Sequence, residues 1–456
     1  MNSIFDARAL YMALLFAVTM LLPKIAPAAD LLEVYRDAAS YDAQYAAARA
    51  SHAAGREKLA QGRALVLPSI ALSAGVSRSN LDVDLDPPAT PSNSKRDFDT
   101  NSYTLALVQP LYRKQNLVQY SQAEFQVRQA DAAFASARQD LVLRVAQTYF
   151  DVLAAQDGLA LISAQKTAIA EQLAQAKRSF EVGAATITDT HEAQARYDLA
   201  QAQEIAAQNT LEIARRVLQQ LTGKTYDLLQ PLREKTALAR LTSDELPTWV
   251  DLGQKQSYAV LAQEAQVELQ SLDVERNRAG NYPTIDFVAS YSGVDQSGTV
   301  LTPIGSRLTL GTVGVQFNMP LYTGGGVASR TREAAALLDK ARADLDAVRR
   351  NQALAVEQNF LNVISGVNQV GALEQALTSS ESALASNKLG YAVGVRINID
   401  VLNAQQQVFS TRRELSAARY RTILNQLRLQ AAVGDLNEDD LDQVNRVLAP
   451  AAASTR

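Results

Sequence analysis

The segment Phe180-Glu-Val-Gly-Ala-Ala-Thr-Ile-Thr-Asp189 is matched near the C-terminus by Tyr391-Ala-Val-Gly-Val-Arg-Ile-Asn-Ile-Asp400. A nearly equal offset relates Gln109-Pro-Leu-Tyr112 to Met319-Pro-Leu-Tyr322. The units of solenoid proteins span only a few dozen residues, so this repeat is of a different kind. It indicates one duplicated building block, in which each half of the chain is expected to form the same structure.

A long helix is predicted ahead of each copy of this segment. Apolar residues recur at multiples of seven positions, as at Val152, Leu159 and Leu173, and the series is repeated in the second half. Such spacing is typical of helices that pack lengthwise against other helices. A single helix over residues 114–181 would be about 100 Å long at 1.5 Å per residue. The alternative is several shorter helices broken near Gly158.

The repeated segments themselves predict the turns of two helical hairpins. Gly183 and Gly394 can adopt the left-handed conformation that ends a helix. Asp189 and Asp400 can cap the helix that follows or lie in its first turn. We therefore expect two turns, at residues 182–188 and 393–399.

Ahead of each long helix, apolar and polar residues alternate with a period of two, which predicts strands. The four predicted strands lie near residues 68–80, 101–112, 283–294 and 309–322. Each has about 9–12 residues, the length of a tilted strand that crosses a membrane. Polar loops at residues 82–99 and 293–307 would join the strands of each pair. The alternative is two soluble hairpins packed on a core.

The composition limits the class of protein. Aromatic residues make up only 6% of a chain with 47% hydrophobic residues, which favours long helices over an aromatic-rich enzyme core. The absence of cysteine excludes disulfides, thiolate metal sites and a cysteine-linked lipid anchor. A net charge of −4 without a basic patch argues against nucleic-acid binding.

The N-terminus has the features of a secretory signal peptide, with an apolar stretch from Ala9 to Leu22 and small residues that allow cleavage at Ala28 or Ala29. An uncleaved anchor is the alternative, although the apolar run is short for a spanning helix. No later segment has the roughly 20 apolar residues of a membrane helix. The expected divisions are a signal peptide (1–29), a first repeat (30–222), a connector (223–250), a second repeat (251–433) and a C-terminal helix and tail (434–456).

Four strands cannot close a transmembrane barrel, because the smallest such barrels need about eight. Open strand edges in lipid leave backbone groups without hydrogen-bond partners. If the strands cross a membrane, the chain must therefore oligomerise. Eight strands enclose only side chains, so a conduit favours at least three chains, whose helical hairpins would extend the tube.

Motifs spread over the mature chain resemble those of the TolC-type outer-membrane channels of efflux and type I secretion. They include Leu67-Pro-Ser-Ile70, Tyr282-Pro-Thr-Ile-Asp286, Pro320-Leu-Tyr-Thr-Gly-Gly325 and Gly434-Asp-Leu-Asn-Glu-Asp-Asp-Leu441. The resemblance implies an α+β membrane protein, a homotrimer with a 12-strand barrel in the outer membrane of a Gram-negative bacterium. Long coiled helices would continue it as a periplasmic α-barrel, with an equatorial belt formed by the connector and the C-terminal tail. It also implies a periplasmic adaptor and an inner-membrane ABC or RND-type transporter as partners, and a passive role in exporting proteins or small molecules.

The resemblance further implies functions for residues at the tip formed by the hairpin turns. Tyr391 and Arg396 of one hairpin and Thr188 and Asp189 of the other would form a latch that holds the tip closed. The family carries two carboxylates three residues apart at its periplasmic entrance. Here the first is Asp400, but Asn403 takes the second place, so one anionic ring is implied. From the residues alone, Asp400 is equally a first-turn residue favoured by the helix dipole, and Arg396 an exposed loop cation.

Other signals indicate no enzyme, cofactor or metal site. His52 and His191 are far apart and lack carboxylates at metal-ligand spacing. Gly324-Gly-Gly326 is not followed by Lys-Ser or Lys-Thr, which favours a strand-to-helix junction over a phosphate-binding loop. The alternative function is a non-channel periplasmic coiled-coil adaptor or scaffold of an export complex. An adaptor would carry one hairpin flanked by all-β modules, whereas this chain predicts two hairpins and membrane-length strands.

Overall fold

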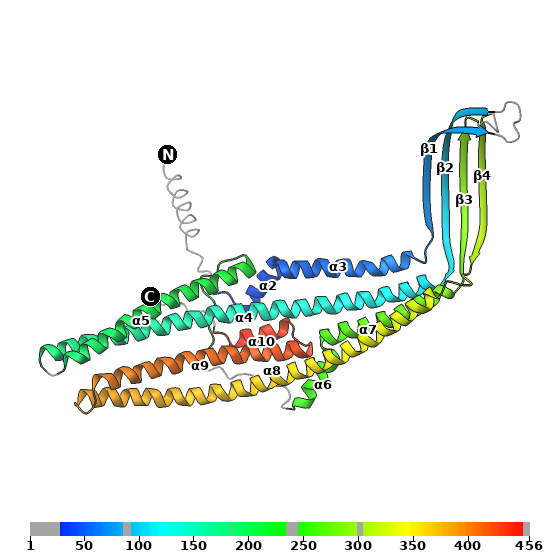
Figure 1. Cartoon of the computed structure of the whole chain (residues 1–456). Helices are drawn as coiled ribbons and strands as arrows, with labels where there is room; N and C mark the ends of the chain where they lie inside the picture. The colour runs from blue at the N-terminus through cyan, green and yellow to red at the C-terminus, as the bar shows by residue number, and fades with distance from the viewer. Residues whose placement is uncertain (1–27, 85–92, 184, 234–244, 299–303, 450–456) are drawn as a thin grey trace, which may run out of the picture.

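Each half of the chain forms a strand hairpin and a helical hairpin, and the two halves lie side by side (Figure 1). The computed structural model describes residues 28–84, 93–183, 185–233, 245–298 and 304–449, so nearly all of the expected signal peptide lies outside the described residues. The elements are α2 (Leu31–Tyr41), α3 (Ala43–Ala64), β1 (Ser69–Asp84), β2 (Asn93–Arg113), α4 (Lys114–Glu181), α5 (Ile187–Thr222), α6 (Leu246–Gln256), α7 (Tyr258–Arg278), a 3-10 turn (Ala279–Asn281), β3 (Thr284–Gln296), β4 (Ser306–Asn318), α8 (Gly326–Ala392), α9 (Asn398–Val433) and α10 (Glu438–Val447).

The helices α4 and α8 form the long axis of the molecule. They contain 68 and 67 residues, so each is about 100 Å long at 1.5 Å per residue. The alternative of a helix broken near Gly158 is wrong, because α4 runs through this residue without interruption. Each long helix joins the sheet at one end and a hairpin turn at the other (Figure 1). Within the described residues, no helix is both long and apolar enough to cross a bilayer.

The four strands form one antiparallel sheet in the order β1-β2-β3-β4. Its register aligns Ile70, Leu107, Ala289 and Val313 in one row across the sheet. The adjacent row, on the opposite face, consists of Ala71, Ala106, Ser290 and Thr312. In these rows one face is apolar and the other carries small and polar side chains, although Leu308 and Leu310 of β4 also lie on the second face.

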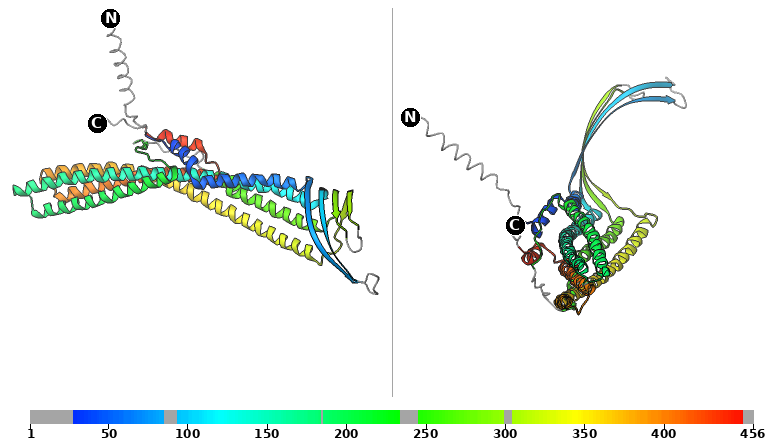
Figure 2. Two further views of the ribbon diagram at one scale, coloured as in Figure 1. Left: turned by 90° about the horizontal axis from the view of Figure 1, so that it is seen from above. Right: turned by 90° about the vertical axis from the view of Figure 1, so that its left-hand side faces the viewer.

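The apolar face of the sheet is uncovered in the single chain. Leu72, Val313 and Phe317 are all more than half exposed on it. Figures 1 and 2 show the sheet extending away from the helices, with no helix of the described chain lying over either face. The alternative of soluble hairpins packed on a core is therefore wrong, and the face suits contact with lipid.

The strands differ in length from those predicted, because polar side chains continue the first hairpin. β1 extends to Asp84 and β2 starts at Asn93, so most of the predicted loop at 82–99 is strand. Lys95 and Asp82 form a 2.7 Å ion pair between the strands of this extension. Likewise β3 continues to Gln296 and β4 starts at Ser306 inside the second predicted loop, whereas β4 ends four residues before the predicted limit of 322. This extension is mostly polar, with few apolar residues such as Leu81 and Phe98, so hydrophobic alternation did not predict it.

The largest apolar core lies midway along the helices, where both ends of the described chain meet. Tyr149 and Phe150 of α4 pack there with Leu31 of α2 and Leu441 of α10. The Tyr149 hydroxyl shares its single proton between two backbone carbonyl oxygens, those of Ala29 at 3.2 Å and Gln230 at 2.9 Å. The core thus ties the start of the described chain, the segment after α5 and the C-terminal helix to the middle of α4.

Candidate functional site at the tip of the hairpins

The two hairpin turns have the same backbone construction. Gly183 and Gly394 have φ values of 75° and 78°, in the left-handed region that favours glycine. A Cβ at either position would meet no atom within 4 Å, so backbone conformation rather than crowding accounts for the glycines. Both turns lie at the same end of the molecule, opposite the sheet (Figure 1).

The predicted latch residues of the first hairpin lie in the first turn of α5, where Asp189 caps the helix. The Asp189 carboxylate accepts hydrogen bonds from the Thr186 backbone N–H at 3.0 Å and the Thr186 hydroxyl at 2.8 Å, which completes a capping box. Thr188 lies beside it in the first turn of α5 and is exposed. The Asp189 side chain is therefore engaged within its own hairpin.

Of the predicted residues in the second hairpin, the structure brings Arg396 and Asp400 together. A guanidinium nitrogen of Arg396 lies 3.7 Å from a carboxylate oxygen of Asp400, and the Arg396 side chain is well exposed. The half-buried Tyr391 makes no side-chain hydrogen bond within the described residues. Within one chain, then, Tyr391 and Arg396 do not bond to the predicted latch residues of the first hairpin.

Asn403, at the predicted second position of the entrance, contacts a cation that sequence reasoning missed. Its Oδ1 accepts a 3.0 Å hydrogen bond from Nη2 of Arg196, a residue of α5. The same guanidinium also donates to Gln406, so Arg196 joins the two hairpins at the tip. No spacing along the sequence connects Arg196 with Asn403, because the contact forms only when the hairpins pack together.

A second polar contact at the tip is buried. Asn398 is only 1% exposed, and its Oδ1 accepts a 2.5 Å hydrogen bond from Nε2 of Gln172 in α4. Its Nδ2 donates a 3.3 Å hydrogen bond to the backbone carbonyl of Asp189 in α5. We call Asn398, Gln172 and the Asp189 carbonyl the amide clasp. The one available sequence signal was that Asn398 takes the place held by Ile187 in the other repeat.

Apolar side chains surround the amide clasp. Leu402 of α9 packs in one cluster with Ile169 and Leu173 of α4 and Ala193 of α5. Asn398 and Leu402 are four residues apart, so they lie on the same side of α9. The clasp is thus part of a seam through which the second hairpin packs against the first.

Closer to the middle of the molecule, the two hairpins share another polar contact. The Tyr420 hydroxyl of α9 lies 2.7 Å from a carboxylate oxygen of Asp157 in α4. Burial raises the pKa of Asp157 above its ordinary value, although the hydrogen bond from Tyr420 acts in the opposite direction. Burial, followed by the charge of Asp157, also raises the pKa of Tyr420.

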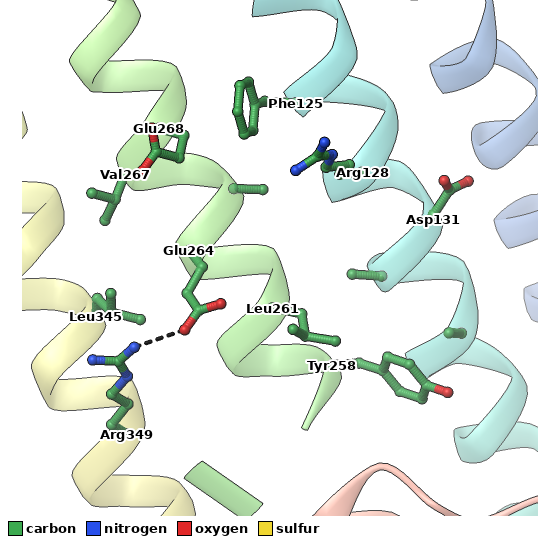
Figure 3. Close-up of a pocket in the computed structure, with 13 residues that line it drawn as sticks. Phe125, Arg128, Asp131, Tyr258, Leu261, Glu264, Val267, Glu268, Leu345 and Arg349 are labelled. Carbon is green, nitrogen blue, oxygen red and sulfur yellow. Dashed lines mark hydrogen bonds and ion pairs between the residues drawn. The ribbon is translucent and has the colours of Figure 1, made fainter. Parts of the chain in front are cut away.

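The helices near the sheet carry an open groove with a volume of about 730 Å³ (Figure 3). Among the side chains that line it, Arg349 and Glu264 form a 2.7 Å ion pair and Arg128 lies 4.8 Å from the centre of the Phe125 ring. No group of three or more His, Cys, Asp or Glu residues in the described chain is placed to hold a metal ion. His52 has a structural partner, because it pairs with Asp131 at 2.6 Å and links α3 to α4.

Long helical hairpins that continue from a sheet with an apolar face define the subunit of an outer-membrane export channel. The chain matches the family model for outer membrane efflux proteins over residues 34–224 and 249–435, and it belongs to this family. It is 33% identical over 419 residues to outer membrane protein TolC of Vibrio cholerae, a match that covers 92% of this chain and 93% of that protein. It is 34% identical over 430 residues to the alkaline protease secretion protein AprF of Pseudomonas aeruginosa, covering 94% and 89% of the two chains.

Solved structures share the fold. The outer membrane protein VceC of Vibrio cholerae aligns with a TM-score of 0.75 at 18% identity, over 89% of this chain and 96% of that chain. The CmeC outer membrane channel of Campylobacter jejuni also aligns with a TM-score of 0.75, at 16% identity, over 93% and 90% of the two chains. These likenesses confirm the predicted fold class, and the family places the chain with the channels rather than with coiled-coil adaptors.

Proposed function

We propose that three copies of this chain form a passive duct for proteins or small molecules across the outer membrane. The single observation that carries the proposal is the four-stranded sheet, which has one apolar face and two unpaired edges. In lipid each edge requires another strand, so the sheet must be completed by neighbouring copies. Three copies supply twelve strands, enough to enclose a channel, whereas two copies supply only eight.

The repeat indicates how neighbouring copies would meet. Within the chain, α4 of the first repeat packs against α7 and α9 of the second. By the approximate symmetry of the repeat, α8 would pack against α3 and α5 of the next copy. Both faces are available, since α5 exposes Ile205 and Ile213, and α8 exposes Leu354 and Leu361. These apolar stripes are what a helical barrel would bury between subunits.

The junction between sheet and helices supports the same arrangement. Leu321 and Tyr322, which follow the edge strand β4, are both 89% exposed in the single chain. Tyr112, which holds the corresponding place in the first repeat, is paired with Ile285 of β3 and is only 36% exposed. A neighbouring copy beside β4 would supply the cover that Tyr322 lacks.

At the tip, the three copies would arrange their hairpin turns around one axis. Three Asp400 side chains would then form an anionic ring at the periplasmic entrance. Tyr391 and Arg396 would bond to Thr188 and Asp189 of a neighbouring hairpin, a latch that one chain cannot complete alone. Residues 223–250 and the C-terminal segment would form the equatorial belt around the main apolar core.

The duct itself performs no chemistry, and the energy for export would come from an inner-membrane ABC or RND-type transporter. A periplasmic adaptor would connect that transporter to the tip. The likeness to AprF, a protease secretion protein, supports proteins among the cargo. The equally extensive likeness to TolC-type channels leaves small molecules as a second cargo class.

Purification from outer membranes and reconstitution into planar lipid bilayers test the proposal. We expect trimers that resist dissociation in SDS without heating, and discrete single-channel currents. A mature chain that is monomeric and stable without detergent, and that produces no currents, would overturn the proposal.

A further inference from the structure

The amide clasp is not a requirement of the hairpin fold. In the repeat, Ile187 takes the place of Asn398, and Ala383 takes the place of Gln172. Each hairpin forms with its own pair of residues, one amide and one apolar. The Ile187 side chain is 46% exposed in the single chain, whereas Asn398 is buried. The hairpin fold therefore does not depend on both amides, yet Gln172 and Asn398 come together in the seam between the two hairpins.

Other polar atoms in this seam lack partners. Gln405 is on the same side of α9 as Asn398 and only 4% exposed, yet its Oε1 has no hydrogen-bond partner among the described residues. The Thr190 hydroxyl of α5, next to the clasp carbonyl of Asp189, is also buried without a partner there. Buried polar atoms that lack partners favour exposure to water. Separation of the seam would hydrate these atoms, and water would replace the hydrogen bonds of the clasp.

At the position that corresponds to the clasp, the seam between copies would be apolar. By the symmetry of the repeat, Ala383 of α8 would face Ile187 of the next copy. Apolar side chains lose the benefit of burial when they separate, and water offers them no replacement. At the position of the clasp, the seam within the chain therefore costs less to open than the seam between copies.

We propose that the amide clasp is the releasable contact of the tip: it holds α9 against the first hairpin in the narrow state and breaks when the duct opens. The inference rests on the proposed function and names the contact that regulates it. Arg196 bonds to Asn403 and Gln406 across the same seam, and these contacts would break together with the clasp. The contact between Tyr420 and Asp157 lies nearer the middle of the molecule and would remain as the fixed end.

Single-channel recording of the reconstituted full-length protein tests the clasp. We expect Asn398→Ala and Gln172→Ala each to raise the ratio of open to closed states about tenfold, because each removes hydrogen bonds from the narrow state alone. The double variant should exceed neither single variant, since both changes break one network. Asn359→Ala is the matched control: its amide donates to the Ala355 carbonyl of its own helix, well away from the tip, and the variant should behave as the wild type.

A second variant tests the proposal even if the alanine variants fail to assemble. Asn398→Ile combined with Gln172→Ala copies the residue pair of the other repeat. We expect this variant to remain closed at rest and to lose most of its export with the transporter and adaptor present, because an apolar seam does not release. Normal export by this variant would overturn the proposal.

The outcomes separate the clasp from the duct. Assembled Asn398→Ala and Gln172→Ala trimers with wild-type currents would overturn the clasp while the duct stands. A wild-type protein that forms no pore would overturn the proposed function and the clasp with it. Increased opening in the alanine variants, with unchanged SDS resistance of the trimer, supports the clasp as a positioning contact rather than a general support of the fold.

Discussion

The Tyr420 hydroxyl lies 2.7 Å from the Asp157 carboxylate and joins the returning helix of the second hairpin to the long helix of the first. Tyr420→Phe should lower the free energy of unfolding by about 1–3 kcal/mol, because a half-buried carboxylate loses a donor. Burial already raises the pKa of Asp157, so the native state binds the proton more tightly than the unfolded state. The stability therefore falls as the pH rises from the ordinary value of 3.8 through the raised pKa.

The hydrogen bond from Tyr420 favours the charged form of Asp157, so the loss of stability in Tyr420→Phe depends on pH. The defect should be large at neutral pH and shrink once acid protonates Asp157. Thermal unfolding followed by circular dichroism at a series of pH values measures it. In a background of Asp157→Asn the pH dependence should disappear, and a defect of equal size at every pH would contradict this explanation.

Asp42 has the opposite pH dependence. Arg144 donates two 3.0 Å hydrogen bonds to its carboxylate and thereby lowers its pKa below the ordinary value of 3.8. The contribution of the Asp42–Arg144 pair to stability is present above pH 3.8 and is lost as the pH falls through the lowered pKa. Arg144→Met should cost about 2 kcal/mol at neutral pH and flatten the acid limb of the stability curve. An unchanged acid limb would show that the pair does not contribute.

The proposed anionic ring predicts a change in ion selectivity. Asp400→Ala should reduce the preference for cations and the block by multivalent cations, because three carboxylates leave the entrance. It also frees Arg396, which lies 3.7 Å from Asp400. Asn403→Asp should strengthen the block by adding a second ring. Reversal potentials in a salt gradient measure the selectivity, and currents with added multivalent cations measure the block; identical results for all three proteins would remove Asp400 from the entrance.

Removal of the proposed latch residues should loosen the tip. Arg396→Ser combined with Tyr391→Phe should raise single-channel conductance, because contacts between neighbouring copies are lost. Arg412→Ser is a suitable comparison, since Arg412 pairs with Glu381 within the same hairpin, further from the turn. Equal conductance in the latch variant and the wild type would show that these two residues do not restrain the tip.

Adjacent residues of β4 test which face of the sheet contacts lipid. Val313 belongs to the apolar row and Thr312 to the polar row on the opposite face. Val313→Arg should cost about 2–4 kcal/mol in the bilayer and reduce the amount of SDS-resistant trimer in the outer membrane. Thr312→Arg should assemble normally and alter conductance instead. The reverse result would exchange the two faces.

The parts of the fold that could be predicted are those encoded by local periodicity. Seven-residue spacing around Val152 and Leu173 predicted the long helix, and Gly183 predicted its end because few other residues tolerate that backbone. The strands were predicted only as far as their alternation lasts, near Val76. Beyond it, cross-strand pairs such as Lys95 with Asp82 leave no hydrophobic pattern to detect.

The site was only partly predictable. Asp400 and Arg396 were found through their resemblance to family positions, and their roles between copies stay predictions. Asn398 and Arg196 were missed, because their partners lie more than 200 residues away along the chain. Such contacts depend on how the two hairpins pack, which no local spacing encodes.

The two strand hairpins differ in length. The last pair between β2 and β3 is Thr100 with Gln296, whereas β1 and β2 continue together to Asp84 and Asn93. At about 3.4 Å per residue, the first ribbon continues roughly 25 Å beyond the second, and its end curves sideways (Figure 1). In a ring of three copies, long and short ribbons would alternate around the mouth. An epitope tag grafted onto the long ribbon should therefore be accessible to an antibody from outside the cell.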